Sequence, residues 1–187
     1  KSVGLQFHFA VKGSTDTVEV YTTRPDTLFG VTFVTLAPEH PLVAKVTTAD
    51  QRAKVEEYQK SAAQKSEVAR QDASKEKTGC FTGGYVIHPA TLKEVPIWIS
   101  DYVMMGYGTG AVMAVPAHDE RDFEFATKFG LEKPVVIDGG QKPDECFSGD
   151  GKCINSDFIN GLSNKEGMKK VIEWAEQKKI GKATTKY

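Results

Sequence analysis

The sequence predicts a mixed α/β domain, with short strands in the middle of the chain and helices before and after them. Several short runs alternate apolar and polar residues, as half-buried strands do. Two charged stretches follow residues that commonly cap helices. Clusters of glycine and proline separate these runs and indicate turns between them.

The composition fits one globular domain. The chain has 187 residues, of which 40% are hydrophobic and 26% charged, and its 24 basic and 25 acidic side chains give a net charge of −1. This is ordinary for a soluble folded protein and excludes a polycation that wraps nucleic acid. No apolar stretch approaches the roughly 20 residues of a membrane helix, and the first residues lack the apolar segment of a signal peptide. We expect any nucleic-acid contact to be local.

In the first part of the chain, residues 17–23 predict a half-buried strand, which ends at Arg24-Pro25-Asp26 because proline fixes φ and has no backbone donor. A second strand is predicted from Leu28 to Leu36. From about Thr47 to Arg70 the composition predicts one or two surface helices, with Thr47 and Asp50 as a capping box. We expect this helical segment to be scaffold.

In the rest of the chain, three further strands are predicted, at residues 84–89, 93–99 and 111–115. A helix is predicted over 120–129, with Asp119 as its N-cap and Gly130 at its end. Residues 138–157 are predicted to form a long loop. A last helix is predicted to begin after Ser163, with Glu166 completing a capping box, and to stop near Gly181.

Three cysteines, Cys80, Cys146 and Cys153, are an odd number and form no C-x-x-C motif. This pattern argues against a disulfide framework and against a zinc cluster, and it favours reduced cysteines. A pair between Cys146 and Cys153, which lie on either side of a glycine-rich segment, stays open as the alternative.

A glycine-rich turn contains Gly106, Gly108 and Gly110. A strand follows it, whereas a dinucleotide-binding fingerprint opens a helix, so that class is excluded. The phosphate-binding P-loop and the serine nucleophile elbow are also missing from the sequence. A tight turn that passes close to another group is favoured over a phosphate cradle.

Two polar turns are candidate sites. One, from Thr22 to Thr27, carries three hydroxyls, a cation and a carboxylate, although threonines at a strand end can reflect β-propensity alone. The other crowds His118, Asp119, Arg121 and Asp122 at a helix start, and helix capping explains only part of this cluster. The residues by themselves leave both alternatives open.

Both turns resemble signatures of one family. Thr-Thr-Arg-Pro-Asp-Thr-Leu-Phe-Gly at 22–30 and Met-Ala-Val-Pro-Ala-His-Asp-Glu-Arg-Asp at 113–122 resemble the editing domain inserted in leucyl-tRNA synthetases of the bacterial and organellar type. The related isoleucyl and valyl insertions share only a Thr-Thr-x-Pro-x-Thr form of the first motif. The resemblance extends over essentially the whole chain and is weakest at 138–157.

The resemblance implies an α+β fold, with a β-barrel-like core, peripheral helices, and the two motifs together at one end of the core. It implies that residues 1–187 are a single editing domain excised from a larger class I aminoacyl-tRNA synthetase. The His-Ile-Gly-His-like and Lys-Met-Ser-Lys-Ser-like signatures of aminoacylation are absent. We therefore expect no aminoacylation activity, and ATP binding only in the parent enzyme.

The implied activity is hydrolysis of the aminoacyl ester of mischarged tRNA-Leu, which removes norvaline, isoleucine or methionine and spares leucine. Such editing is needed because one methylene gives only about 1–3 kcal/mol of discrimination. Thr27 would exclude leucine, and Asp122 would bind the substrate α-ammonium. Arg24 would pair with Asp119 or meet the tRNA end. The remaining implied roles are catalysis by Thr22, Thr23, Asp119 and Asp122, a pocket wall of Met113, Val115 and His118, and adenine contacts from Met104 and Tyr107.

The implied partners are the 3′-terminal adenosine of tRNA-Leu and the rest of the parent synthetase. We expect a monomer without metal or cofactor, because an aminoacyl ester is already activated and a positioned water suffices. The expected location is the cytoplasm or an organellar matrix. Two alternatives remain, a free-standing trans-editing hydrolase and a tRNA-docking module without activity of its own.

Overall fold

The structure, a computed structural model, describes residues 2–187. Its internal contacts divide the chain into two compact units. The first unit comprises Lys1–His8, Tyr21–Thr32 and Ala114–Tyr187. The second comprises Phe9–Val20 and Phe33–Met113. Both signature motifs begin or end near these boundaries.

The second unit is built on strands, in the order β2-β1-β4-β5-β3-β6. β4 and β5 pair antiparallel with Val86 opposite Val95, and β3 runs parallel to β5 with Leu36 opposite Ile99. These apolar residues are buried, so the pairing forms the core of the unit. The strands are β1 (Ser2–Val11), β2 (Thr17–Thr22), β3 (Phe33–Leu36), β4 (Cys80–Ile87), β5 (Glu94–Ile99) and β6 (Ala111–Ala114).

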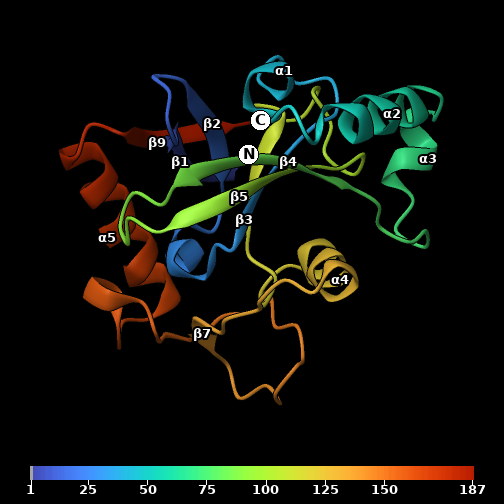
Figure 1. Ribbon diagram of the computed structural model, residues 1–187. Coiled ribbons are helices and arrows are strands. Elements are labelled where there is room, and N and C mark those ends of the chain that lie inside the picture. Colours follow the sequence, from blue (N-terminus) through green and yellow to red (C-terminus); the bar gives the residue numbers. More distant parts are fainter. Residues whose placement is uncertain (1) are drawn as a thin grey trace. The chain divides into compact units, whose positions relative to one another are not determined.

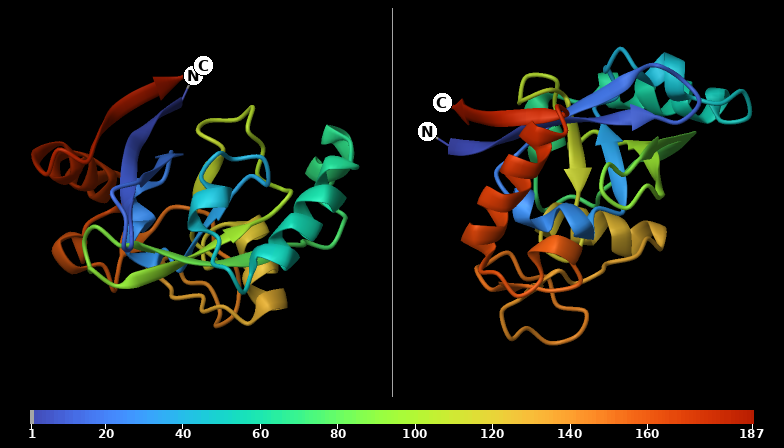
Figure 2. Two further views of the ribbon diagram at one scale, coloured as in Figure 1. Left: turned by 45° about the horizontal axis from the view of Figure 1, so that its top comes forward. Right: turned by 90° about the vertical axis from the view of Figure 1, so that its left-hand side faces the viewer.

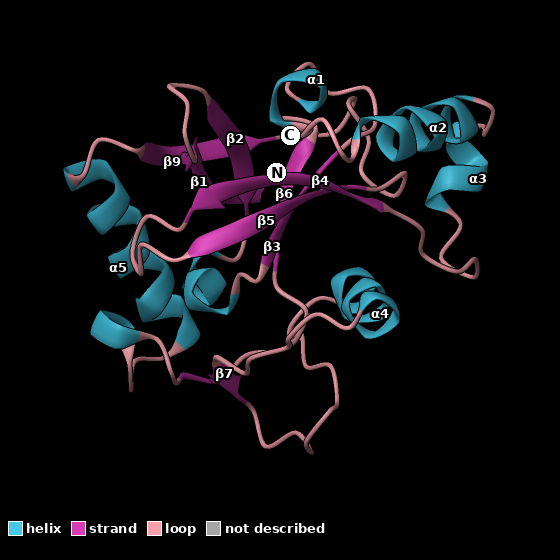
Figure 3. Ribbon diagram, viewed as in Figure 1, coloured by secondary structure: helices cyan, strands magenta, loops and turns pink. Residues whose placement is uncertain are grey.

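Three helices accompany these strands, α1 (Val43–Val46), α2 (Arg52–Ala63) and α3 (Glu67–Gln71) (Figure 3). α1 and α2 pack against β4. The one or two surface helices predicted over residues 47–70 are present as α2 and α3, but the predicted capping box is wrong. Gln51 caps α2 without a side-chain hydrogen bond, while Thr47 Oγ1 donates to the carbonyl of Val43.

In the first unit, β9 (Gly181–Lys186) pairs antiparallel with the first part of β1, from Phe7 opposite Gly181 to Ser2 opposite Lys186 (Figures 1 and 2). The helix α5 (Asn164–Gln177) packs against β9 and against the 3-10 helix η1 (Pro25–Gly30). The other elements are α4 (Glu120–Phe129), β7 (Ile137–Asp138), β8 (Lys152–Cys153) and the 3-10 helix η2 (Asp157–Ile159).

The helix ends of this unit follow the sequence closely. Asp119 accepts hydrogen bonds from the amides of Arg121 and Asp122 at the start of α4, and Gly130 ends the helix at a φ of 69°. Ser163 Oγ accepts from the amide of Glu166 at the start of α5. These predicted caps are confirmed. They could be predicted from the sequence because each depends only on residues within one turn.

Several elements differ from the prediction. The strand expected from Leu28 begins only at Phe33, because Pro25 opens a 3-10 helix that runs to Gly30. α5 ends at Gln177, and Gly181 begins β9 rather than following a helix. The predicted loop 138–157 contains a two-residue ladder between β7 and β8.

The predicted α+β class, with a strand core and peripheral helices, is confirmed. Over residues 2–187 a sheet of seven strands includes β9, which pairs with β1 off the main path. This order has β2 at one end and β6 at the other and is not a closed barrel. Within the same residues no helix has the length and apolar character needed to cross a membrane.

Candidate functional site

The threonine-rich turn of the first unit is fixed by hydrogen bonds to its own backbone. Thr22 Oγ1 accepts from the amide of Arg24 at 2.9 Å. The carbonyl of Arg24 accepts from the amide of Thr27 at 3.0 Å and from its Oγ1 at 2.8 Å. Thr23 is exposed on this turn, and Thr27 is buried. The hydroxyl bond therefore holds Thr27 in one rotamer.

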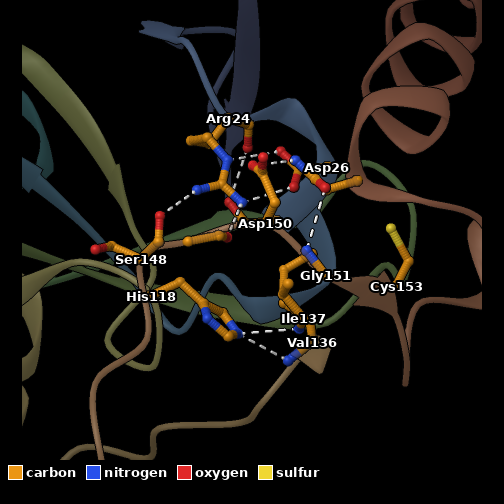
Figure 4. Close-up of polar contacts among 12 residues, drawn as sticks. Arg24, Asp26, His118, Val136, Ile137, Ser148, Asp150, Gly151 and Cys153 are labelled. Atoms are coloured by element: carbon orange, nitrogen blue, oxygen red, sulfur yellow. Dashed lines mark hydrogen bonds and ion pairs between the residues drawn. The ribbon is translucent and has the colours of Figure 1, made fainter. Parts of the chain in front are cut away.

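Arg24 forms a two-pronged ion pair with Asp26 (Figure 4). Arg24 Nε lies 3.1 Å from Asp26 Oδ1, and Nη2 lies 2.9 Å from Oδ2. Asp26 is fully buried, and the Arg24 side chain is 27% exposed. Burial alone lowers the pKa of Arg24, but the hydrogen bond and charge of Asp26 outweigh it, and the pKa lies above its ordinary value. The alternative in which Arg24 pairs with Asp119 is therefore wrong, because Asp26 takes that place and Asp119 is the cap of α4. A contact of Arg24 with the tRNA end stays a prediction.

The same guanidinium holds a loop. Arg24 Nη1 donates to the carbonyl of Ser148 at 3.0 Å, and Nη2 lies 3.5 Å from the carbonyl of Gly149. Figure 4 shows Asp150 beside this guanidinium, and Asn164 Nδ2 donates to Asp150 Oδ1 at 3.0 Å. The loop of residues 139–151 is thus attached to the threonine turn by Arg24 and to α5 by Asn164.

His118 connects the second motif to both ends of this loop. Its Nε2 lies 3.0 and 3.1 Å from the amides of Val136 and Ile137 and accepts from both. Its Nδ1 lies 2.6 Å from the carbonyl of Phe147 and must therefore be the protonated nitrogen. Burial lowers the pKa of His118, which agrees with a neutral ring.

Asp122, a residue of the second motif, also binds the backbone. It is buried in the first turn of α4, and its Oδ2 accepts from the amide of Val115 at 3.0 Å. Its own amide donates to Asp119 Oδ1 at 3.1 Å. The start of a helix favours a negative charge at this position.

The two motifs meet inside the first unit. The amide of Thr32 donates to the carbonyl of Ala114 at 3.2 Å. A Cβ atom on Gly30 would lie 3.0 Å from Val115 and 2.9 Å from Val136, so a larger residue would require these side chains to shift. The threonine turn, Val115, His118 and Asp122 therefore belong to one packed cluster.

The other predicted site residues lie in the second unit. Met113 is buried in β6, and Met104 is buried where the glycine-rich turn begins. Met105 and Tyr107 on the same turn are 39% and 67% exposed. The exposed thioether of this turn is therefore that of Met105, next to the residue predicted.

The cysteines are free, including Cys146 and Cys153, for which a disulfide was the open alternative. Burial and the charges of Glu120 and Asp119 raise the pKa of Cys146 to about 12. Burial and Asp26 raise the pKa of Cys153 to about 11. Both thiols stay protonated at neutral pH, so neither is activated as a nucleophile.

Sequence reasoning missed Asp26, although it stands inside the first motif. Its spacing of two residues from Arg24 on a proline turn was the available signal. It also missed the carbonyls of Ser148 and Gly149, because backbone acceptors leave no mark in the sequence. The first unit offers fixed hydroxyls, a buried carboxylate and a packed wall, which together can orient a small polar substrate and a water.

Two comparisons with known proteins identify the family to which the chain is similar. Residues 1–176 match the family model of the leucyl-tRNA synthetase editing domain. A similar solved structure is the ternary complex of the Agrobacterium radiobacter K84 agnB2 LeuRS with tRNA and LeuAMS, at 33% identity and a TM-score of 0.79. That match covers 100% of this chain and 20% of the other, so this chain spans one-fifth of the length of that synthetase.

We predict that His118 makes stability depend on pH. The folded chain holds the pKa of His118 below its ordinary value of 6.5, so the unfolded chain binds the proton more readily. Stability should therefore fall as the pH drops below about 6.5. The charge of Arg24 lowers this pKa further and that of Asp26 opposes the change. Urea unfolding from pH 7.5 to 5 should show a smaller loss for His118→Gln, and equal losses would contradict the assignment.

For the ion pair, we predict that the two partners are not equivalent. Arg24→Ala leaves the fully buried Asp26 without a counterion and should cost about 3–5 kcal/mol. Asp26→Asn keeps an acceptor of the same shape and leaves a partly exposed guanidinium, so about 1–2 kcal/mol is expected. Denaturant unfolding measures both, and the double variant should be more stable than Arg24→Ala alone. Equal losses from the two single variants would refute this view.

Proposed function

The chain belongs to the family of leucyl-tRNA synthetase editing domains, and from that premise we propose that it hydrolyses the aminoacyl ester of mischarged tRNA-Leu. Norvaline, isoleucine and methionine are the amino acids removed, and leucyl-tRNA is spared. The reaction needs neither ATP nor the aminoacylation centre of the parent enzyme.

One observation carries the proposal, the meeting of the two motifs in one packed cluster. The hydrogen bond from Thr32 to Ala114 and the close approach of Gly30 to Val115 bring the threonine turn beside the start of α4. The segment that follows the threonine turn is thus in direct contact with the residues that precede α4. An aminoacyl ester carries an α-ammonium and ribose hydroxyls, which are the groups such a cluster recognises.

Each part of the cluster has a role in this reaction. The carboxylate of Asp122 binds the α-ammonium and thereby fixes the ester carbonyl. Thr22 and Thr23 orient the terminal ribose and the attacking water, and Asp119 keeps the start of α4 in place. Arg24 acts through the turn and the loop that it holds. Val115 and His118 form the wall of the pocket in this unit.

Thr27 selects by shape. Because its hydroxyl is engaged by the carbonyl of Arg24 at 2.8 Å, its methyl group is fixed as well. A fixed branched side chain excludes the γ-branched end of leucine, whereas the side chains of norvaline, isoleucine and methionine, which have no branch at Cγ, pass. Selection of this kind is worth about 1–3 kcal/mol, a factor of about 10 to 200.

The partners follow from the substrate. The chain meets the 3′-terminal adenosine of tRNA-Leu and works as a monomer next to the rest of the parent synthetase. Its net charge is −1, so it has no excess of basic side chains with which to bind the phosphates of a whole tRNA. Most phosphate contacts would therefore belong to the rest of the parent synthetase. The proposed location is the cytoplasm or an organellar matrix.

The proposal predicts selective hydrolysis of norvalyl-tRNA-Leu over leucyl-tRNA-Leu. Asp122→Asn should abolish this activity because it removes the charge that binds the α-ammonium. The same change keeps an oxygen acceptor for the amide of Val115, so the fold should survive. The release of labelled amino acid at high protein concentration measures both reactions.

The matched control is Asp138→Asn, which removes one exposed carboxylate elsewhere in the first unit. Its activity should equal that of the wild type. Hydrolysis of neither ester by a folded wild-type chain would contradict the proposal and favour a docking module. Full activity of Asp122→Asn would remove the ammonium contact from the mechanism.

Three substitutions at Thr27 separate shape from hydrogen bonding. Thr27→Ala and Thr27→Ser both delete the methyl group, so hydrolysis of leucyl-tRNA should rise about tenfold or more. Thr27→Val keeps the branch and loses only the hydroxyl, so leucyl-tRNA should stay protected. Deacylation rates of leucyl-tRNA-Leu show whether the shape of Thr27 or its hydrogen bond protects this ester.

Thr27→Ser also serves as the control for folding, because it retains the hydrogen bond to the carbonyl of Arg24. If Thr27→Val lost protection while Thr27→Ser kept it, the hydroxyl and not the methyl group would be the selective element.

A further inference from the structure

The glycine-rich loop of residues 101–109 exposes side chains that its own packing does not explain. Tyr107 is 67% exposed and Met105 39% exposed. A Cβ atom on Gly106 or Gly108 would meet nothing within 4 Å, so the middle of the loop is open to its surroundings. An exposed aromatic ring beside a thioether is a surface on which a nucleic-acid base can stack.

The side chain of Arg70, in the short helix α3, binds backbone carbonyls at the start of this loop. Its Nε donates to the carbonyl of Asp101 at 2.9 Å, and its Nη2 donates to the carbonyl of Val103 at 3.0 Å. Glu39 accepts from the two Nη atoms of the same guanidinium, at 2.6 and 3.2 Å. The Arg70 side chain is only 8% exposed. One rigid guanidinium thus fixes two carbonyls that lie just before Met104.

Further polar contacts join the same helical segment to the loop. Gln71, next to Arg70, lies with its Nε2 3.3 Å from the phenol oxygen of Tyr107. Lys65 Nζ lies 2.6 Å from Asp101 Oδ2, and the phenol oxygen of Tyr58 accepts from the amide of Asp101 at 2.9 Å. The loop is therefore held at its beginning and at its aromatic tip.

These contacts are not explained by the hydrophobic core. α3 has no buried apolar residue, although the side chain of Arg70 is largely shielded from water. Removing a guanidinium from water is costly, and here hydrogen bonds to the loop carbonyls and to Glu39 offset this cost. A helix that has no buried apolar residue and directs two side chains at an exposed loop fits a role in shaping that loop.

We propose that Arg70 and Gln71 are positioning residues that hold the 101–109 loop in the shape that receives the terminal nucleoside of the substrate. The inference rests on the proposed function, because that function supplies the nucleoside. It assigns a purpose to a helical segment that the sequence presents as scaffold. The residues act through Met105 and Tyr107 and do not touch the reacting ester.

The test compares Arg70→Lys with Lys65→Met. Arg70→Lys keeps the charge opposite Glu39 but cannot reach two carbonyls at once. Lys65→Met removes a cation from the side chain of Asp101 and leaves both backbone contacts in place. Hydrogen exchange of the amides of residues 101–109 should accelerate in Arg70→Lys and stay near wild type in Lys65→Met.

The ligand readout uses 3′-(norvalylamino)-3′-deoxyadenosine, a stable amide analogue of the substrate end. Its dissociation constant and the KM for norvalyl-tRNA should rise about five- to tenfold in Arg70→Lys, with kcat within about twofold of wild type. A purely structural role would lower the fraction of folded protein and so the apparent kcat instead. Gln71→Leu should raise KM in the same direction by a smaller factor.

The outcomes separate the two proposals. If the wild-type chain binds the analogue, and Arg70→Lys binds it equally well with unchanged exchange of the loop, the positioning role is overturned and the editing function stands. If the wild-type chain neither binds the analogue nor hydrolyses norvalyl-tRNA, the editing function fails and the nucleoside role of the loop fails with it. Faster exchange together with a raised KM supports the inference.

Discussion

The buried ion pair of Asp26 with Arg24 is the contact on which the first unit's site depends. Asp26 has no exposure to water, so its charge is tolerated only because the guanidinium meets it with two hydrogen bonds. This pairing orients the backbone of Arg24, whose carbonyl holds the hydroxyl of Thr27. The rest of the guanidinium reaches the carbonyl of Ser148. One pair thus fixes a turn and a loop.

In both units an arginine side chain orders a glycine-rich loop. Glycine-rich loops lose much conformational entropy on ordering and have few side chains with which to recover it. In each unit an arginine with a carboxylate partner binds backbone carbonyls of such a loop, Arg24 at Ser148 and Arg70 at Asp101 and Val103. The carboxylate satisfies the charge, and the remaining donors satisfy the loop. Arginine suits this task because its donors have a fixed geometry.

The helix caps could be predicted from the sequence because they depend on neighbouring residues. Contacts between distant segments could not be predicted. Asp119 and Ser163 were recognised as caps because the groups they bind lie within three residues. The pairing of β1 with β9 joins the two ends of the described chain, and no local pattern announces it. The strand expected at Leu28 failed because Pro25 favours a helical first turn. The family motifs pointed to both turns of the site, but the carbonyls of Ser148 and Gly149 that Arg24 binds lie 124 and 125 residues away and leave no mark in the sequence.

The proposed ester hydrolysis requires a rigid site. An aminoacyl ester is reactive enough that a well-placed water attacks it, so the rate depends on orientation more than on an activated side chain. The two shielded thiols, with pKa values of about 12 and about 11, fit a site of that kind. Orientation in turn requires that Asp122 does not move, and its bond to the amide of Val115 secures it. In the proposed function the same carboxylate both stabilises the fold and binds the substrate. Asparagine separates the two roles because it keeps an oxygen acceptor and removes the charge.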